Sequence, residues 1–169
     1  CFMERYTGIA YPFPKYDLVA IPSFQYAGME HPGCIFLNAS RVFLAENPSA
    51  DDLMERANLI AHETAHIWFG DYVTMPWFDE VWMKEVFAGF MADKITGHLF
   101  LKEDFRLRFL LAHYPPSYDI DRTPGTNPIA QKLVNLNIAG SLYGNIIYHK
   151  APIAIMQLEK LAGEEVFRQ

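Results

Sequence analysis

The sequence has no excess of basic residues. Its 169 residues include 14 lysines and arginines against 20 aspartates and glutamates, which gives a formal net charge of −6. A protein that binds the phosphate backbone of nucleic acid needs a basic face to neutralise that backbone. The charge balance therefore argues against a nucleic-acid partner.

Long apolar runs and cysteines are also scarce. No run of 18 apolar residues exists, so the sequence contains no candidate membrane span. The two cysteines, Cys1 and Cys34, are too few for a disulfide framework. They leave the compartment open, with a slight preference for the cytoplasm over a secreted or periplasmic location. Internal repeats, low-complexity tracts and interdomain linkers are absent as well.

Material for a hydrophobic core is plentiful. Apolar residues make up 51% of the chain and aromatic residues 15%, and the length corresponds to one domain or part of one. The chain starts at Cys1 without a methionine and ends in the pattern of a continuing helix. We therefore expect a piece of a longer protein, with residues 1–46 rich in β-structure and residues 49–169 mainly helical.

The most informative stretch is His62-Glu63-Thr64-Ala65-His66, an H-E-x-x-H motif. Two side chains four residues apart lie on one face of a helix, so both imidazoles can reach one small cation. Catalytic zinc takes three protein ligands and keeps a fourth position for water. A carboxylate from elsewhere must then supply the third ligand. Glu63 lies beside the metal and can accept a proton from the bound water.

The surroundings of the motif predict a helix. Ser49 can cap its start, with Asp51 and Asp52 in the first turn, and Gly70 is expected to end it. Apolar residues and one threonine recur at helical spacing and are expected to form its core face: Leu53, Ala57, Ile60, Thr64 and Ile67. The alternative is a pair of packed histidines that flank a glutamate by chance.

A second helix is predicted from Asp79 or Glu80 to Thr96, ended by Gly97. Glu85 follows the motif after 18 intervening residues and lies on a largely apolar stripe of this helix. Burying a carboxylate there without a partner would be costly, and a metal ion would be a sufficient partner. Glu85 is therefore the expected third ligand.

The segment before the motif predicts a small mixed sheet beside the metal helix. Residues 18–21 have the pattern of a buried strand, and residues 34–37 that of a second one. The glycine-containing segment between them is a turn on composition alone. An exposed edge strand of such a sheet could bind a peptide as an additional strand.

The last third of the chain is expected to be mostly helical. A short amphipathic helix is predicted for residues 103–112, followed by a loop at 115–128 that is either a connector or a wall of the site. Another helix is predicted for residues 131–143. A final one runs from Asn145 through Tyr148 and ends at Gly163.

These features together resemble one known family. H-E-x-x-H followed by 18 residues and a glutamate is the signature of the gluzincin aminopeptidases, the group of aminopeptidase N and the leukotriene hydrolase. Residues 27–31, Ala-Gly-Met-Glu-His, lie where that family has its Gly-Ala-Met-Glu-Asn exopeptidase motif. Residues 82–88 are similar to the segment around the third ligand, and residues 148–150 to the segment around the catalytic tyrosine. The resemblance runs from about Tyr11 to the end.

The resemblance implies a metal centre in an α+β, thermolysin-like catalytic domain, truncated here at both ends. His62, His66 and Glu85 would hold one zinc ion per chain. Glu63 would be the general base and later protonate the leaving amine. Tyr148 would donate a hydrogen bond to the tetrahedral oxyanion.

The resemblance also implies the substrate and the partners. Glu30 would pair with the free α-amino group of a peptide, while Gly28 and Met29 complete the substrate-binding segment, Gly28 through its backbone. Flanking N- and C-terminal domains would belong to the parent protein. Ala27, Gly28 and His31 stand where the family has Gly, Ala and Asn, and Ala151 stands where it has Gly.

The predicted function is thus a zinc-dependent aminopeptidase. Two alternatives remain at this point. One is a zinc endopeptidase or another hydrolase on the same scaffold, and the other is a non-catalytic binding domain that keeps the fold. The intact set of Glu63, Tyr148 and three ligands favours an enzyme.

Overall fold

A three-stranded mixed sheet lies in the N-terminal part of the chain. The computed structural model describes residues 1–169, and its strands are β1 (Asp17–Ile21), β2 (Gly28–Met29) and β3 (Cys34–Asn38). The strand order is β1-β3-β2: β1 runs parallel to β3, and β2 runs antiparallel to it, with Gly28 opposite Leu37. The predicted mixed sheet and the α+β class are therefore confirmed.

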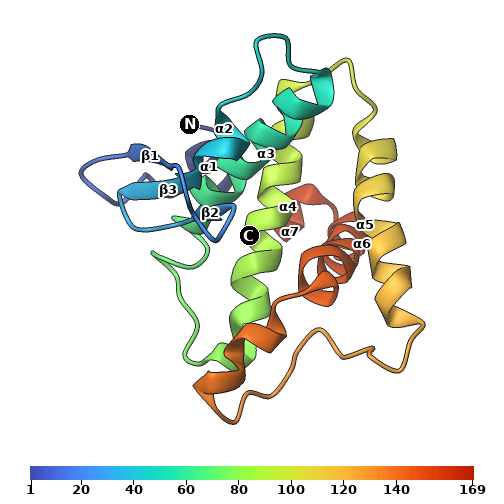
Figure 1. Cartoon of the computed structure of the whole chain (residues 1–169). Coiled ribbons are helices and arrows are strands. Elements are labelled where there is room, and N and C mark those ends of the chain that lie inside the picture. The colour runs from blue at the N-terminus through green and yellow to red at the C-terminus, as the bar shows by residue number, and fades with distance from the viewer.

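The helices form the rest of the molecule (Figure 1). They are α1 (Phe2–Thr7), α2 (Ala39–Val42), α3 (Ala50–His66), α4 (Val81–Leu99), α5 (Phe105–Asp121), α6 (Ala151–Ala162) and α7 (Glu164–Phe167). Short 3₁₀ segments occur at η1 (Phe78–Glu80) and η2 (Leu136–Leu142), and η3 (Ile146–Lys150) is a π-helical turn. None of these helices has both the length and the apolar character needed to cross a bilayer.

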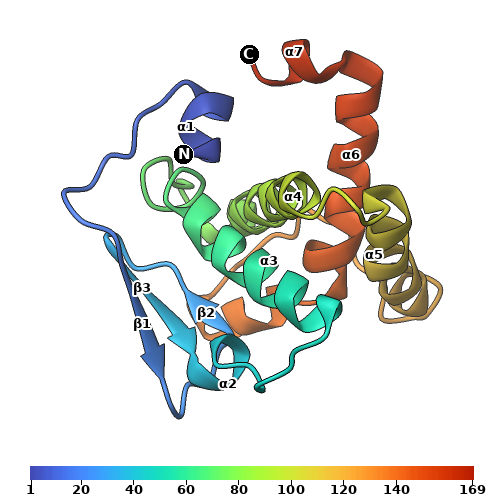
Figure 2. The same ribbon diagram turned by 90° about the horizontal axis from the view of Figure 1, so that it is seen from above.

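Helix α3 lies between the sheet and α4 (Figure 2). Helices α5 and α6 lie beyond α4, so the motif helix and α4 form the middle of the molecule. The main core fills the contacts between α3, α4 and α6, and its buried side chains include Ala65, Trp68, Val86, Phe90 and Ile155. Small residues such as Ala65 and Ala88 are fully buried there, which lets the helix backbones approach closely.

A capping box starts α3 as predicted. The Ser49 hydroxyl accepts a hydrogen bond from the Asp52 backbone N–H at 3.1 Å, and the Asp52 carboxylate accepts one from the Ser49 N–H at 2.8 Å. The helix ends at His66, so the predicted end at Gly70 is wrong. Gly70 instead has a φ of 141° in the loop that follows, where a Cβ would lie 3.3 Å from the His66 carbonyl oxygen.

The predicted core face of α3 is also wrong in part. Ile67 is buried, but the other four predicted positions are only partly buried. The fully buried helical face is offset and carries Met54, Ala61 and Ala65. The reason is that α4 packs against α3 much more extensively than the sheet does, so side chains on the α4 side of α3 are buried more deeply.

Helix α4 is longer than predicted. It begins at Val81, after η1, and continues through Gly97 to Leu99. A Cβ at Gly97 would lie 2.7 Å from the ring of Phe105, the first residue of α5. The glycine therefore permits a close helix contact and does not terminate the helix.

Three expectations for the N-terminal part need correction. Residues 2–7 form helix α1 within the segment expected to be extended, because the prolines that prevent a helix lie further on, at positions 12 and 14. Strand β1 is not buried, since Leu18 is 45% and Val19 39% exposed on the outer strand. The segment expected to be a turn contains the short edge strand β2.

The C-terminal part differs from the prediction mainly in α5. This helix continues through Pro115 and Pro116 to Asp121, so the predicted loop starts too early. The Ser117 hydroxyl bonds the His113 carbonyl at 2.6 Å and supports the helix past the prolines. The helix predicted for 131–143 is reduced to η2, whereas the final helix is confirmed and ends at Gly163, whose φ is 82°.

Candidate metal centre

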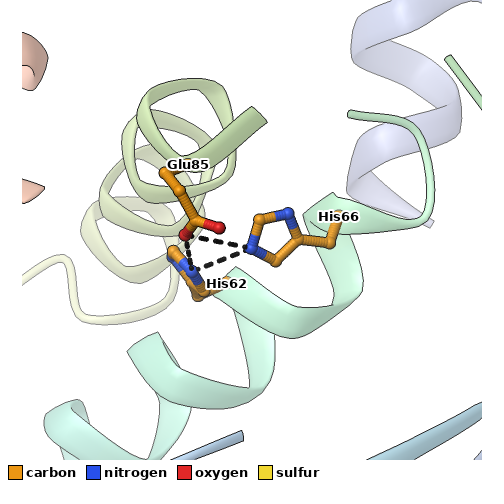
Figure 3. Close-up of side chains that lie close together, drawn as sticks. All are labelled: His62, His66 and Glu85. Atoms are coloured by element: carbon orange, nitrogen blue, oxygen red, sulfur yellow. Dashed lines mark hydrogen bonds and ion pairs between the residues drawn. The ribbon is translucent and has the colours of Figure 1, made fainter. Parts of the chain in front are cut away.

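Three side-chain atoms converge between α3 and α4 (Figure 3). His62 and His66 project from consecutive turns of α3, and Glu85 projects from the first turns of α4. The two Nε2 atoms are 3.0 Å apart, and each lies 3.5 Å from Oε2 of Glu85. The structure thus brings together the three ligands that the sequence predicts.

The geometry of these atoms fits a zinc ion. Bonds of about 2.0–2.2 Å in a tetrahedral site place neighbouring ligand atoms roughly 3.3 Å apart, and two imidazoles with one carboxylate are a usual zinc donor set. His66 Nδ1 lies 3.1 Å from the Phe69 carbonyl oxygen, which can only accept a hydrogen bond. The proton of His66 is therefore on Nδ1, and the lone pair of Nε2 points into the site.

The candidate ligands are well shielded from solvent. His66 is 2% exposed and Glu85 5% exposed. Burial alone would raise the pKa of Glu85, but the adjacent imidazoles of His62 and His66 hold that pKa well below its usual range. The Glu85 carboxylate is therefore ionised, as a metal ligand must be.

Glu63 lies directly beside this cluster. Its side chain is 5% exposed, and its carboxylate belongs to a second convergent group with Glu30 and His66. Burial, supported by the negative charges of Glu30 and Glu85, raises the pKa of Glu63 to about 7, while His62 opposes the shift. A carboxyl group with such a pKa can both accept and release a proton near neutral pH.

Glu30 follows β2 and forms an ion pair with Lys84. Burial opposes ionisation of Glu30, but the proximity of His66 and the hydrogen bond from the Lys84 ammonium lower its pKa. The Lys84 ammonium also lies 3.5 Å from Oε1 of Glu85. Sequence analysis missed Lys84, and the only signal available was its place next to the predicted ligand.

The edge strand β2 brings its backbone to the same site. Gly28 lies directly against the Glu63 side chain, and a Cβ added there would require the Glu63 carboxylate to shift. Met29 pairs with Phe36 of β3, which leaves the opposite edge of β2 without a neighbouring strand.

Tyr148 lies on η3, on the α5 and α6 side of α4. With Glu85 and His62 it lines a cavity of about 540 Å³. Burial, followed by the charge of Glu85 and the neighbouring Tyr143, raises the pKa of Tyr148 far above its usual range. The hydroxyl therefore keeps its proton and remains a hydrogen-bond donor.

Asp71 is a further acidic residue near the site that sequence analysis passed over. Its Oδ2 atom is buried without a hydrogen-bond partner. Burial, helped by the charge of Glu30, raises the pKa of Asp71 to about 6. Nothing in the local pattern indicated this, because the residue looks like part of an ordinary loop after Gly70.

Known proteins match this chain over nearly its whole length. The model of the peptidase family M1 domain matches residues 1–169. The chain is 34% identical over 168 residues to "Probable aminopeptidase 2" of Sulfurisphaera tokodaii and 34% identical to "Leucyl aminopeptidase" of Saccharolobus solfataricus. It is 31% identical over 170 residues to "Glutamyl aminopeptidase" of Bos taurus.

These matches cover 99% of this chain but only 22%, 21% and 18% of the three relatives. The chain thus spans about a fifth of the length of the curated relatives it matches. The family model matches the whole chain, including the two helices that carry the cluster of two histidines and a glutamate. The chain belongs to peptidase family M1.

Proposed function

We propose that this chain carries the catalytic centre of a zinc-dependent aminopeptidase. The observation that carries the proposal is the convergence of the His62, His66 and Glu85 donor atoms beside the buried carboxylate of Glu63 and the partly buried one of Glu30. The names of the relatives support it, since three of them are aminopeptidases from archaea and an animal.

Glu63 would carry out the proton transfers of the reaction. A zinc ion held by His62, His66 and Glu85 would polarise the scissile carbonyl and lower the pKa of a water molecule from about 15.7 to about 7. Glu63 would accept the proton of that water and pass it to the leaving amine. Its own pKa of about 7 in the buried site suits both directions of transfer.

Tyr148 would act on the carbonyl oxygen. Its hydroxyl keeps its proton because burial and the Glu85 charge raise its pKa. It would donate a hydrogen bond to the oxygen as negative charge develops there. One preorganised donor of this kind contributes roughly 3–4 kcal/mol to transition-state stabilisation.

Glu30 would make the enzyme an exopeptidase. Its ionised carboxylate can bind the α-ammonium group of a peptide that lies along the open edge of Gly28–Met29. Glu30 and Glu63 are close enough to belong to one convergent group with His66. Only one residue would therefore fit between the amine anchor and the reacting carbonyl.

The test compares two forms of one peptide on the protein with any native flanking sequence and bound zinc. We expect release of the first residue from the peptide with a free N-terminus and no cleavage of the N-acetylated form. Internal cleavage of the acetylated peptide would establish an endopeptidase. Binding of zinc without cleavage of either peptide would establish a non-catalytic domain.

A further inference from the structure

A second polar network joins three elements beside the cavity that Tyr148 lines. Asp93 of α4, His113 of α5 and His149 of η3 are connected in a row. His113 Nε2 lies 2.9 Å from Oδ2 of Asp93, and its Nδ1 lies 3.3 Å from Nδ1 of His149. His113, in the middle of the row, is only 7% exposed, whereas Asp93 and His149 are partly buried.

The direction of the hydrogen bonds follows from the carboxylate. Asp93 can only accept, so His113 carries its proton on Nε2 and offers the lone pair of Nδ1 to His149. His149 then donates from its own Nδ1. Burial and the proximity of His113 lower the pKa of His149, which is consistent with a neutral imidazole that donates one proton. The row is therefore ordered from Asp93 to His149.

The network links the elements that carry the site. The other carboxylate oxygen of Asp93 accepts a hydrogen bond from Asn58 at 3.1 Å, and Asn58 lies one turn before His62 on α3. Asp93 itself lies eight residues after Glu85 on α4. At the other end, His149 directly follows Tyr148 in a π-helical turn, a conformation that is rare and needs support from its surroundings.

We propose that Asp93, His113 and His149 are positioning residues that hold the Tyr148 turn at a set distance from the two helices carrying the metal ligands. The proposal rests on the proposed role of Tyr148. A second metal site does not explain the cluster, because Asp93 and His149 bond opposite edges of the His113 ring and their donor atoms do not converge.

The first test uses His113→Phe in the protein with any native flanking sequence and bound zinc. Phenylalanine keeps a ring against Phe109, whose centroid lies 4.4 Å from that of His113, and removes both nitrogens. We expect kcat to fall about tenfold to a hundredfold, since small misplacements of a reacting group have effects of this size. KM should change by less than about threefold, because the substrate contacts are intact.

A double-mutant cycle shows whether the effect passes through Tyr148. In a Tyr148→Phe background the same substitution should lower kcat by less than about twofold, since the group to be positioned is gone. An equal loss in both backgrounds, or an unchanged kcat in the single variant, would overturn the proposal. Asp93→Asn can still accept from His113 and should retain most of kcat, whereas Asp93→Ala should not.

The matched control is Ser117→Ala. It removes a buried hydrogen bond from the same helix, one turn beyond His113, and leaves the row of side chains intact. It should lower the melting temperature without the loss of kcat. If Ser117→Ala and His113→Phe lowered kcat equally, the network would be structural only and the proposal would be wrong.

Hydrogen exchange separates this proposal from the proposed function. Deuterium uptake at residues 146–150 should rise in His113→Phe and in His149→Phe, but not in Ser117→Ala. This readout does not need turnover, so it decides the matter even if the unaltered protein cleaves no peptide, a result that would refute only the proposed function. Unchanged uptake in both histidine variants would overturn the positioning role.

Discussion

At the scale of residues, the site is defined by the balance of its charges. Three carboxylates, those of Glu30, Glu63 and Glu85, are buried close together, and Lys84 is the cation that the chain itself places among them. Burying like charges in one place is expensive unless they are paired. Protonation of Glu63 with its pKa of about 7 relieves part of this cost, and a bound dication would relieve more.

Glu63→Gln tests the division of roles within this group. The amide keeps the size of the side chain but cannot take a proton, so turnover should fall by about 10²–10⁴-fold. Zinc content should not change, because the three ligands are untouched. Elemental analysis and kcat measure the two effects separately, and a variant with normal turnover would remove Glu63 from its role.

Glu30→Gln tests the amine anchor. Glutamine can still accept a hydrogen bond from Lys84, so the buried ammonium keeps a partner while the negative charge is lost. KM for peptides with a free N-terminus should rise by at least about tenfold, as expected for a lost ion pair with a charged group. Unchanged peptide affinity in this variant would refute the anchor.

At the scale of elements, the site depends on how two helices pack. The capped α3 and the longer α4 each carry part of the metal cluster, and small residues at their contact let donor atoms meet between them. The predicted α4 is too short because glycine commonly ends a helix, whereas Gly97 lies inside this one. Local propensity and tertiary packing give opposite predictions at such a position.

Gly97→Ala and Gly89→Ala separate these two influences within α4. Alanine favours a helix over glycine by about 1 kcal/mol. At Gly89 a Cβ has only an ordinary contact of 3.9 Å with His62, so the free energy of unfolding should rise or stay level. At Gly97 it would meet the Phe105 ring, so the free energy should fall. Denaturant titration of both variants checks the difference, and equal values would contradict the packing argument.

In the molecule as a whole, a bound metal ion would crosslink α3, which packs against the sheet, to α4, which packs against the C-terminal helices. His62 and His66 belong to α3 and Glu85 to α4, so an ion bound to all three crosslinks the middle of the fold. A ligand that binds only the folded state stabilises it by about 4.1 kcal/mol at a concentration of 1,000 Kd.

Chelation should therefore lower the melting temperature of the zinc-loaded protein, and added zinc should restore it. His62→Ala provides the control, because with one ligand missing its melting temperature should respond weakly to zinc or chelator. Differential scanning calorimetry measures both. A melting temperature that chelator leaves unchanged in the unaltered protein would mean that no metal bridges α3 and α4.

Features that arise within one element can be predicted from the sequence. The spacing of His62 and His66, the cap at Ser49 and the apolar stripe around Glu85 are local patterns, and helix geometry converts each into a shared face. The mixed sheet could also be predicted, since residues 17–21 and 34–38 have the composition of strands.

Contacts between segments far apart in the sequence set which elements meet and how deeply each is buried. Lys84 and Glu30 are 54 residues apart, and His113 and His149 are 36 residues apart, so no local pattern marks either pair. The exposure of β1 likewise depends on which strand lies outermost in the sheet. The physical reason is that periodicity sets the face on which a side chain lies, while its partner is chosen by the packing of distant segments.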